Sequence, residues 1–164
     1  MRRPKWWALI AMLVVAMAAL VVPAVVVADP DSSATVRFGN PDVGSPYPPP
    51  IFEHDSSSNA RDNLIPRTSV ISAGGNVTFD VAGFHQPAIY EAGTTPSDIN
   101  VPPFPVPFNL FINDPDGRLA LGAPAEGPWT PPAGTFDTPG RYLVLCNVTP
   151  HFAFFNMYGW VIVK

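Results

Sequence analysis

The sequence predicts an all-β fold, a Greek-key sandwich or small barrel, and two observations carry this prediction. The chain of 164 residues contains 22 prolines and 12 glycines. Proline lacks an amide donor and clashes with the preceding helical turn, so long helices are nearly excluded. Several short apolar segments lie between turn signals, with no helical period between them. This pattern is typical of a Greek-key β fold and argues against an α/β fold.

The N-terminal segment has the pattern of an export signal. Arg2, Arg3 and Lys5 give a positive start, and residues 6–27 carry no charge. Small or compact residues end at Ala28, which predicts cleavage after that residue. The apolar run also approaches the roughly 20 residues that span a bilayer, so an uncleaved membrane anchor is the alternative. Either reading places the rest of the chain outside the cytoplasm, in a periplasm or in the medium.

The expected strands follow in order along the chain. In the clearest one, Val77, Phe79 and Val81 alternate with polar residues, which is the period of a half-buried strand. The last two are the most hydrophobic segments after the signal, so we expect them at the centre of a sheet. The predicted strands cover residues 35–38, 69–72, 76–81, 108–112, 141–146 and 160–163.

We expect one folded domain after the signal. Residues 1–28 form the signal, residues 29–68 a first strand and an irregular proline-rich arm, and residues 69–164 the core. The segment 101–108 (VPPFPVPF) is apolar but too rich in proline to pair inside a sheet. It is predicted to form a loop over one end of the sandwich.

The charge balance excludes nucleic acid as an expected partner. The chain has thirteen acidic and nine basic residues, a net charge of −4, and three of the basic residues lie in the signal. An acidic surface allows a basic protein partner, and it also simply keeps an exported protein soluble. Charge therefore leaves the function open.

The loop between the last two strands carries the chemistry. Exported proteins normally use cysteines in pairs, yet Cys146 is the only cysteine, and His151 and Met157 follow it closely. A type 1 copper site needs a thiolate, two imidazoles and a weak axial thioether. The loop supplies all but one imidazole, and the chain offers only His54 and His85 for that place.

These residues make the region 69–164 resemble the plastocyanin and azurin family of blue copper proteins. The resemblance rests on the strand leading to Cys146, on the loop after it, and on the histidine that follows an early strand. Two features depart from the family pattern. Five residues separate His151 from Met157, which is longer than usual, and Gln86 stands where many relatives have asparagine. The resemblance implies four copper ligands, namely His85, Cys146, His151 and Met157.

The resemblance also implies a function. We expect an exported, monomeric cupredoxin that holds one copper, cycles it between Cu(I) and Cu(II), and serves protein redox partners such as a cytochrome or an oxidase. It is not expected to be an enzyme, because oxygen-reducing copper enzymes need further metal centres and the chain has only three histidines. The alternatives are a copper-delivery protein with the same fold and a copper-free structural module.

Phenylalanines near the loop predict an apolar environment. We expect the residues after His151 to form an apolar patch around its imidazole, where the electron leaves, although some of these rings are expected to point inward. His54 is expected to be solvated. The candidates for the apolar shell are Phe84, Phe104, Phe108, Phe152, Phe154 and Phe155.

Overall fold

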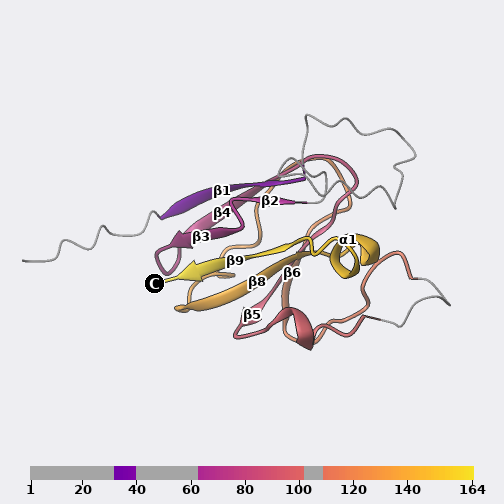
Figure 1. The fold of residues 1–164 in the computed structure, drawn as a ribbon. Helices are drawn as coiled ribbons and strands as arrows, with labels where there is room; N and C mark the ends of the chain where they lie inside the picture. The colour runs from indigo at the N-terminus through magenta and orange to yellow at the C-terminus, as the bar shows by residue number, and fades with distance from the viewer. Residues whose placement is uncertain (1–31, 40–62, 102–108) are drawn as a thin grey trace, which may run out of the picture.

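A computed structural model describes residues 32–39, 63–101 and 109–164, and these form a sandwich of two β-sheets (Figure 1). One sheet contains, in spatial order, β2 (Leu64–Ile65), β1 (Ser33–Phe38), β4 (Asn76–Val81) and β7 (Gly127–Trp129). The other contains β3 (Thr68–Ile71), β9 (Tyr158–Val163), β8 (Gly140–Cys146), β5 (Pro87–Ala92) and β6 (Arg118–Leu121). A short helix, α1, covers Thr149–Ala153, and a 3-10 turn covers Pro96–Asp98. The prediction of an all-β fold is confirmed.

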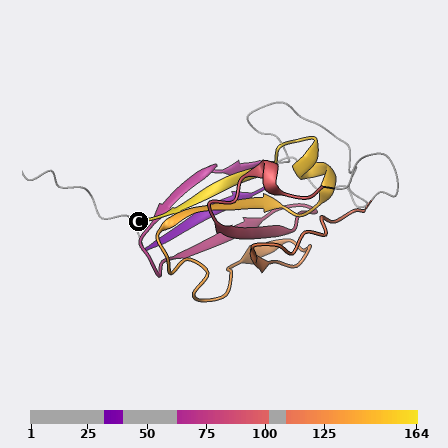
Figure 2. The same ribbon diagram turned by 90° about the horizontal axis from the view of Figure 1, so that it is seen from below.

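Strands β8 and β9 lie inside the five-stranded sheet, as their hydrophobicity predicts. β8 pairs antiparallel with both β5 and β9, and β9 also pairs parallel with β3. In the other sheet, β1 pairs parallel with β4 over its whole length. Figure 2 shows β8 and β9 running side by side through the molecule.

The strand predicted at 108–112 is wrong for its described part. Residues 109–112 form no strand, and Phe111 makes only an isolated bridge with Val148. The backbone of this segment bonds instead to the loop after Cys146, through Ile112 N–H to the Asn147 carbonyl and Thr149 N–H to the Leu110 carbonyl. Alternation of apolar residues alone does not reveal this use of the backbone.

Four strands were not predicted: the two-residue β2, which falls in the predicted irregular arm, and β5, β6 and β7. β5 is buried along four consecutive positions, from Pro87 to Tyr90, because both faces of this part of the sheet are covered. It therefore lacks the alternation of a half-buried strand. β6 and β7 are short strands at the edges of their sheets. Pro128 in β7 is compatible with such an edge, where one row of amides needs no partner.

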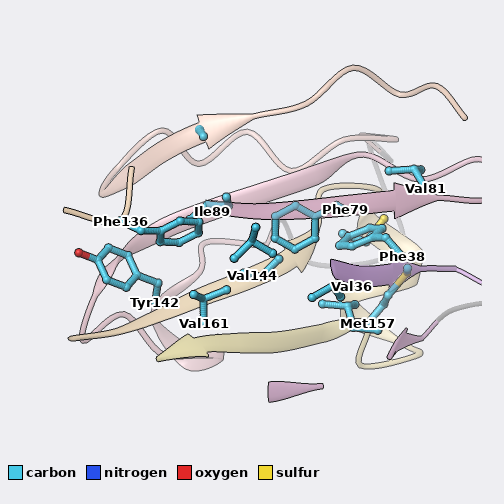
Figure 3. Close-up of a cluster of buried hydrophobic side chains, with 14 of the residues drawn as sticks. Val36, Phe38, Phe79, Val81, Ile89, Phe136, Tyr142, Val144, Met157 and Val161 are labelled. Carbon is cyan, nitrogen blue, oxygen red and sulfur yellow. The ribbon is translucent and has the colours of Figure 1, made fainter. Parts of the chain in front are cut away.

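The inner core fills the space between the two sheets. β8 contributes every second side chain to it, Tyr142, Val144 and Cys146, because successive side chains of a strand point to opposite faces. Figure 3 shows this core, with Phe136 and Tyr142 toward one end and Met157 toward the other. The thiol of Cys146 is thus the last inner-core side chain of β8.

An outer cluster covers part of the opposite face of the five-stranded sheet. Leu143 and Leu145 of β8 enter it, together with Tyr90 of β5. Its cover comes from outside the sheet, through Ile99, Ile112 and Phe152. The part of the five-stranded sheet formed by β5 and by Leu143 and Leu145 of β8 is therefore buried on both faces, by the other sheet on one side and by a loop and α1 on the other.

The two ends of the sandwich differ. α1 lies at one end, and the C-terminus lies at the other (Figure 1). Lys164 accepts a hydrogen bond from Ala73 N–H there, and Ser32 accepts one from Asn76 N–H close by. The described chain therefore starts and finishes at the end opposite α1.

Several sequence predictions fall outside the described residues. These are the signal or anchor at 1–28, most of the arm with His54, and nearly all of the loop at 101–108. Within residues 32–39, 63–101 and 109–164, no helix is long and apolar enough to cross a membrane.

Candidate metal centre

Three of the four predicted ligands meet at the end of the sandwich that carries α1. His85 lies between β4 and β5, Cys146 ends β8, and His151 lies in α1. All three are buried, with exposed fractions of 1%, 0% and 5%. They are the one group of His, Cys, Asp or Glu side chains among the described residues arranged to hold a metal ion.

The three donor atoms form a nearly symmetric triangle. The Nδ1 atoms of His85 and His151 are 2.9 Å apart, and each lies 3.7 Å from Sγ of Cys146. The point equidistant from all three lies about 2.0 Å from each, close to a metal–imidazole bond of about 2.0–2.1 Å and slightly under a metal–thiolate bond of about 2.3 Å. The triangle therefore has the size of a trigonal metal site.

The chemistry of the donors restricts which metal fits. One sulfur and two imidazole nitrogens form the trigonal plane typical of type 1 copper centres. Carboxylates, which suit Mg²⁺ or Ca²⁺, are missing from the group that the described residues form. Sequence reasoning left His54 or His85 as the second imidazole, and the structure places His85 beside Cys146 and His151.

Met157 is buried in the inner core beside this triangle. It belongs to the same core cluster as Cys146 and Phe38, and Figure 3 shows it at the same end of that core as Phe38. Its backbone closes the loop in two places: its carbonyl accepts from Cys146 N–H at 2.9 Å, and its N–H donates to the His151 carbonyl at 3.0 Å. The residue thus lies at the site, and the axial role of its thioether stays a prediction.

Helix α1 accounts for the long spacing between His151 and Met157. The intervening residues complete a helical turn, in which Phe154 N–H bonds to the Pro150 carbonyl and Asn156 N–H to the Phe152 carbonyl. Asn156 then adopts a positive φ of 54°, a conformation that asparagine tolerates better than most residues. The chain turns there, so the extra residues do not move Met157 away from His151.

The imidazole of His85 is packed tightly from the side of β1. The ring of Phe38 meets it edge-on at 6.0 Å between centroids. Gly39 follows with φ of +95°, and a Cβ atom there would lie 2.7 Å from Cδ2 and Nε2 of His85. Only glycine fits without displacing the ring, so β1 helps to fix the position of His85.

A buried clasp joins the two segments that carry His85 and Cys146. Asn147 donates from Nδ2 to Oε1 of Gln86 at 2.8 Å, and its N–H donates to the Gln86 carbonyl at 2.7 Å. Gln86 Nε2 in turn donates to the Gly122 carbonyl at 2.8 Å. Sequence reasoning singled out Gln86 but missed Asn147. The sequence feature that could have indicated Asn147 is its position, a polar residue directly after the thiolate at the end of a buried strand.

The phenylalanines after His151 divide between the interior and the surface. Phe152 is only 7% exposed and packs in the outer cluster against Tyr158, so it does not belong to the predicted patch. Phe154 is 46% exposed, and Phe155 is half-buried with its ring 6.3 Å from that of His151. Phe84 is also half-buried near this end and packs on the inner core. Phe104 and Phe108 lie outside the described residues.

Comparisons with known proteins give matches among solved structures only. No family model and no curated protein matches the chain. An auracyanin from Roseiflexus castenholzii is similar at a TM-score of 0.46 and 16% identity, over 82% of this chain and 98% of that one. A purple cupredoxin from Nitrosopumilus maritimus gives 0.43 and 14%, over 80% and 99%. A plastocyanin from Dryopteris crassirhizoma gives 0.38 and 22%, over 79% and 99%.

Proposed function

We propose that this chain is a mononuclear type 1 copper protein that carries one electron at a time between protein partners outside the cytoplasm. The observation that carries the proposal is the buried triangle of Nδ1 of His85, Sγ of Cys146 and Nδ1 of His151. Its donors and its dimensions suit copper in both oxidation states. Met157 is the fourth, axial residue.

Each proposed ligand has a distinct role in holding the metal. Cys146 supplies the thiolate, and His85 and His151 complete the plane. Copper, when bound, supplies a one-electron change between Cu(I) and Cu(II). A carrier needs a site that rearranges little in that change, and the clasp of Gln86 and Asn147 holds two ligand segments at a fixed separation.

The surroundings keep water from the donors and offer an apolar approach for a partner over α1. Each donor residue is at most 5% exposed, while Phe154 and Ala153 are exposed beside His151. A small apolar contact suits the weak complexes of electron carriers. The partner therefore approaches over α1, and His151 is the ligand that α1 carries.

The test is the absorption spectrum of the purified chain with Cu(II) added. One equivalent should produce an intense thiolate-to-copper band toward the red end of the visible spectrum. Cys146→Ser should remove the band, because only the thiolate supplies that transition. His54→Asn is the matched control and should retain it. A fully coloured Cys146→Ser protein, or a band lost in His54→Asn, contradicts the proposed ligand set.

Reversible voltammetry separates a carrier from a copper-delivery protein. A carrier should keep its copper through repeated oxidation and reduction, and Met157→Leu should stay coloured with a raised potential, because an apolar axial neighbour favours Cu(I). Rapid loss of Cu(I) to a modest chelator indicates delivery instead. An unchanged spectrum and potential in Met157→Leu would remove Met157 from the site.

A further inference from the structure

We propose a second docking surface, on the outer face of β3, β9 and β8, that fits an acidic protein surface; the proposal rests on the proposed carrier function. Two arginines stack there on two aromatic rings. Cζ of Arg141 lies 3.5 Å from the ring centroid of Trp160, and Cζ of Arg67 lies 5.7 Å from that of Tyr158. The two rings are 6.3 Å apart. We call these four residues the arginine–aromatic surface.

Aliphatic side chains extend this surface across three strands. Ile162 of β9 pairs with Val70 of β3 on one side and with Arg141 of β8 on the other. Val70 is 37% exposed, and Ile162, Trp160 and Tyr158 are half-buried. In Figure 1 the three strands lie next to one another in the sheet. An area of this breadth, with an apolar centre, suits a protein face better than a small anion.

The charge of the surface is opposite to that of the chain. Acidic residues outnumber basic ones by thirteen to nine overall, yet two guanidinium groups gather here. Among the described residues, neither Arg67 nor Arg141 forms an ion pair with a carboxylate. Stacking on a ring uses the face of a guanidinium, so Arg141 keeps its in-plane N–H groups available and Arg67 keeps those that do not bond Asn63 or Asn156. Such groups match a carboxylate. The complementary partner is therefore acidic.

Arg67 is held in place before any partner arrives. Its Nε donates to Oδ1 of Asn63 at 3.3 Å, and one terminal nitrogen donates to the Asn156 carbonyl at 2.9 Å. Fixing a long side chain in advance reduces the entropy lost on binding. The second contact also ties the arginine to the residue that precedes Met157.

The surface is continuous with the metal centre through the backbone. Tyr158 directly follows Met157, whose carbonyl accepts the Cys146 N–H. An acidic redox protein docked on Tyr158 and Trp160 therefore contacts the residue that follows the proposed axial ligand in sequence. It does so on the face of the sheet opposite to the inner core. Electrostatic steering toward the two arginines would raise the rate of encounter at low ionic strength.

Titration of the ¹⁵N-labelled chain with poly-L-glutamate, followed by NMR at low ionic strength, tests the proposal. Shifts should centre on the Trp160 indole N–H and on the amides of Tyr158 and Arg141, and added salt should reduce them. Poly-L-lysine should not produce them. Arg141→Gln should weaken binding about fivefold or more, a factor typical of losing one charged contact.

Two further variants separate charge from packing. Arg37→Gln removes the same charge from β1, in the other sheet, and should leave binding within about twofold. Arg141→Lys keeps the charge and should retain more binding than Arg141→Gln. Circular dichroism checks the fold of each variant.

Four outcomes overturn the docking surface. These are no shifts, shifts centred on Phe154 and Phe155, equal weakening by Arg37→Gln, and binding to phosphatidylglycerol vesicles without binding to poly-L-glutamate, which would assign the face to a membrane. The titration is run on the chain both as purified and with copper added. Binding without a copper band contradicts the carrier function, whereas a copper band without binding contradicts only the docking surface.

Discussion

The two sides of β8 perform different tasks although their residues alternate along one strand. Tyr142, Val144 and Cys146 enter the inner core, and Leu143 and Leu145 enter the outer cluster. The inner core ends in the thiolate at the metal end. The outer cluster supports α1 through Phe152 and so determines where His151 lies. The site therefore depends on both faces of one sheet, one face for Cys146 and the other for His151.

The largest effect is expected from the inner core at the end remote from the metal centre. Phe136 is buried and meets Tyr142 edge-on at 5.3 Å. Phe136→Ala should lower the free energy of unfolding by about 3–5 kcal/mol through lost packing and a cavity, measured by urea denaturation. The copper band of the folded variant should be unchanged. A shifted band would show that the far end of the inner core also tunes the site.

Phe152→Ala tests the outer cluster. It should lower the free energy of unfolding by about 3 kcal/mol, the lower end of the range for a buried ring, because Phe152 is 7% exposed. Unlike Phe136→Ala, it should also speed copper loss to a chelator, since α1 carries His151. Phe154→Ala, which removes an exposed ring from the same helix end, is the control. If Phe152→Ala lost copper at the wild-type rate, the outer cluster would not contribute to holding the metal ligands in place.

The clasp that links the two ligand segments should have a smaller effect. Gln86→Met leaves Asn147 Nδ2 and the Gly122 carbonyl without their present partner, at a cost of about 1–3 kcal/mol for buried polar groups. In a double-mutant cycle with Asn147→Leu, the two losses should not add, with a coupling of about 1 kcal/mol. Additive losses would mean that the two side chains act independently.

The smallest effect concerns the buried phenol of the outer cluster. Burial raises the pKa of Tyr90 above its ordinary value of 10.0, with a lesser contribution from Asp114 and an opposing one from Arg118. The folded state thus favours the neutral phenol, which donates to the Asp114 carbonyl at 2.9 Å. Its contribution to stability is complete below about pH 10 and is lost as the pH rises through the folded pKa.

Tyr90→Phe should therefore flatten the alkaline decrease in stability, followed by thermal denaturation between pH 8 and about pH 11. At neutral pH it should cost about 0.5–1.5 kcal/mol for the lost hydrogen bond. Tyr142→Phe is the matched deletion in the inner core, where the hydroxyl donates to the Thr138 carbonyl at 2.6 Å. An alkaline decrease of wild-type size in Tyr90→Phe would contradict a role for this phenol.

The sequence predicted strands correctly where one face of the strand is buried and the other is exposed to solvent. The strand at Asn76–Val81 was predicted to the residue, because Val77, Phe79 and Val81 alternate with polar neighbours. It failed for β5, whose two faces are both covered, and for residues 109–112, whose alternation serves a loop. Both failures involve packing against distant segments that local pattern does not specify: the outer cluster covers β5, and residues 109–112 pack partly in the outer cluster, through Ile112, and partly against the inner core.

The metal centre was predictable for a chemical reason. Cysteine, histidine and methionine within one loop are a rare combination, and the chain has few histidines to complete it. The clasp was not predictable in full, because Asn147 is polar and looks like an ordinary loop residue until Gln86 is placed opposite it. The inward position of Phe152 likewise follows from α1, which the proline-rich composition gave no reason to expect.

The position of the two ends of the described part of the chain has a practical meaning for attaching this protein to a surface. Ser32 and Lys164 both lie beside the turn at 73–75, at the end opposite α1. A tether joined after Lys164 to an electrode or a bead therefore leaves His151 and its apolar surroundings facing the solution. Oriented films of the protein can be made through its C-terminus without burying the end where a partner would approach.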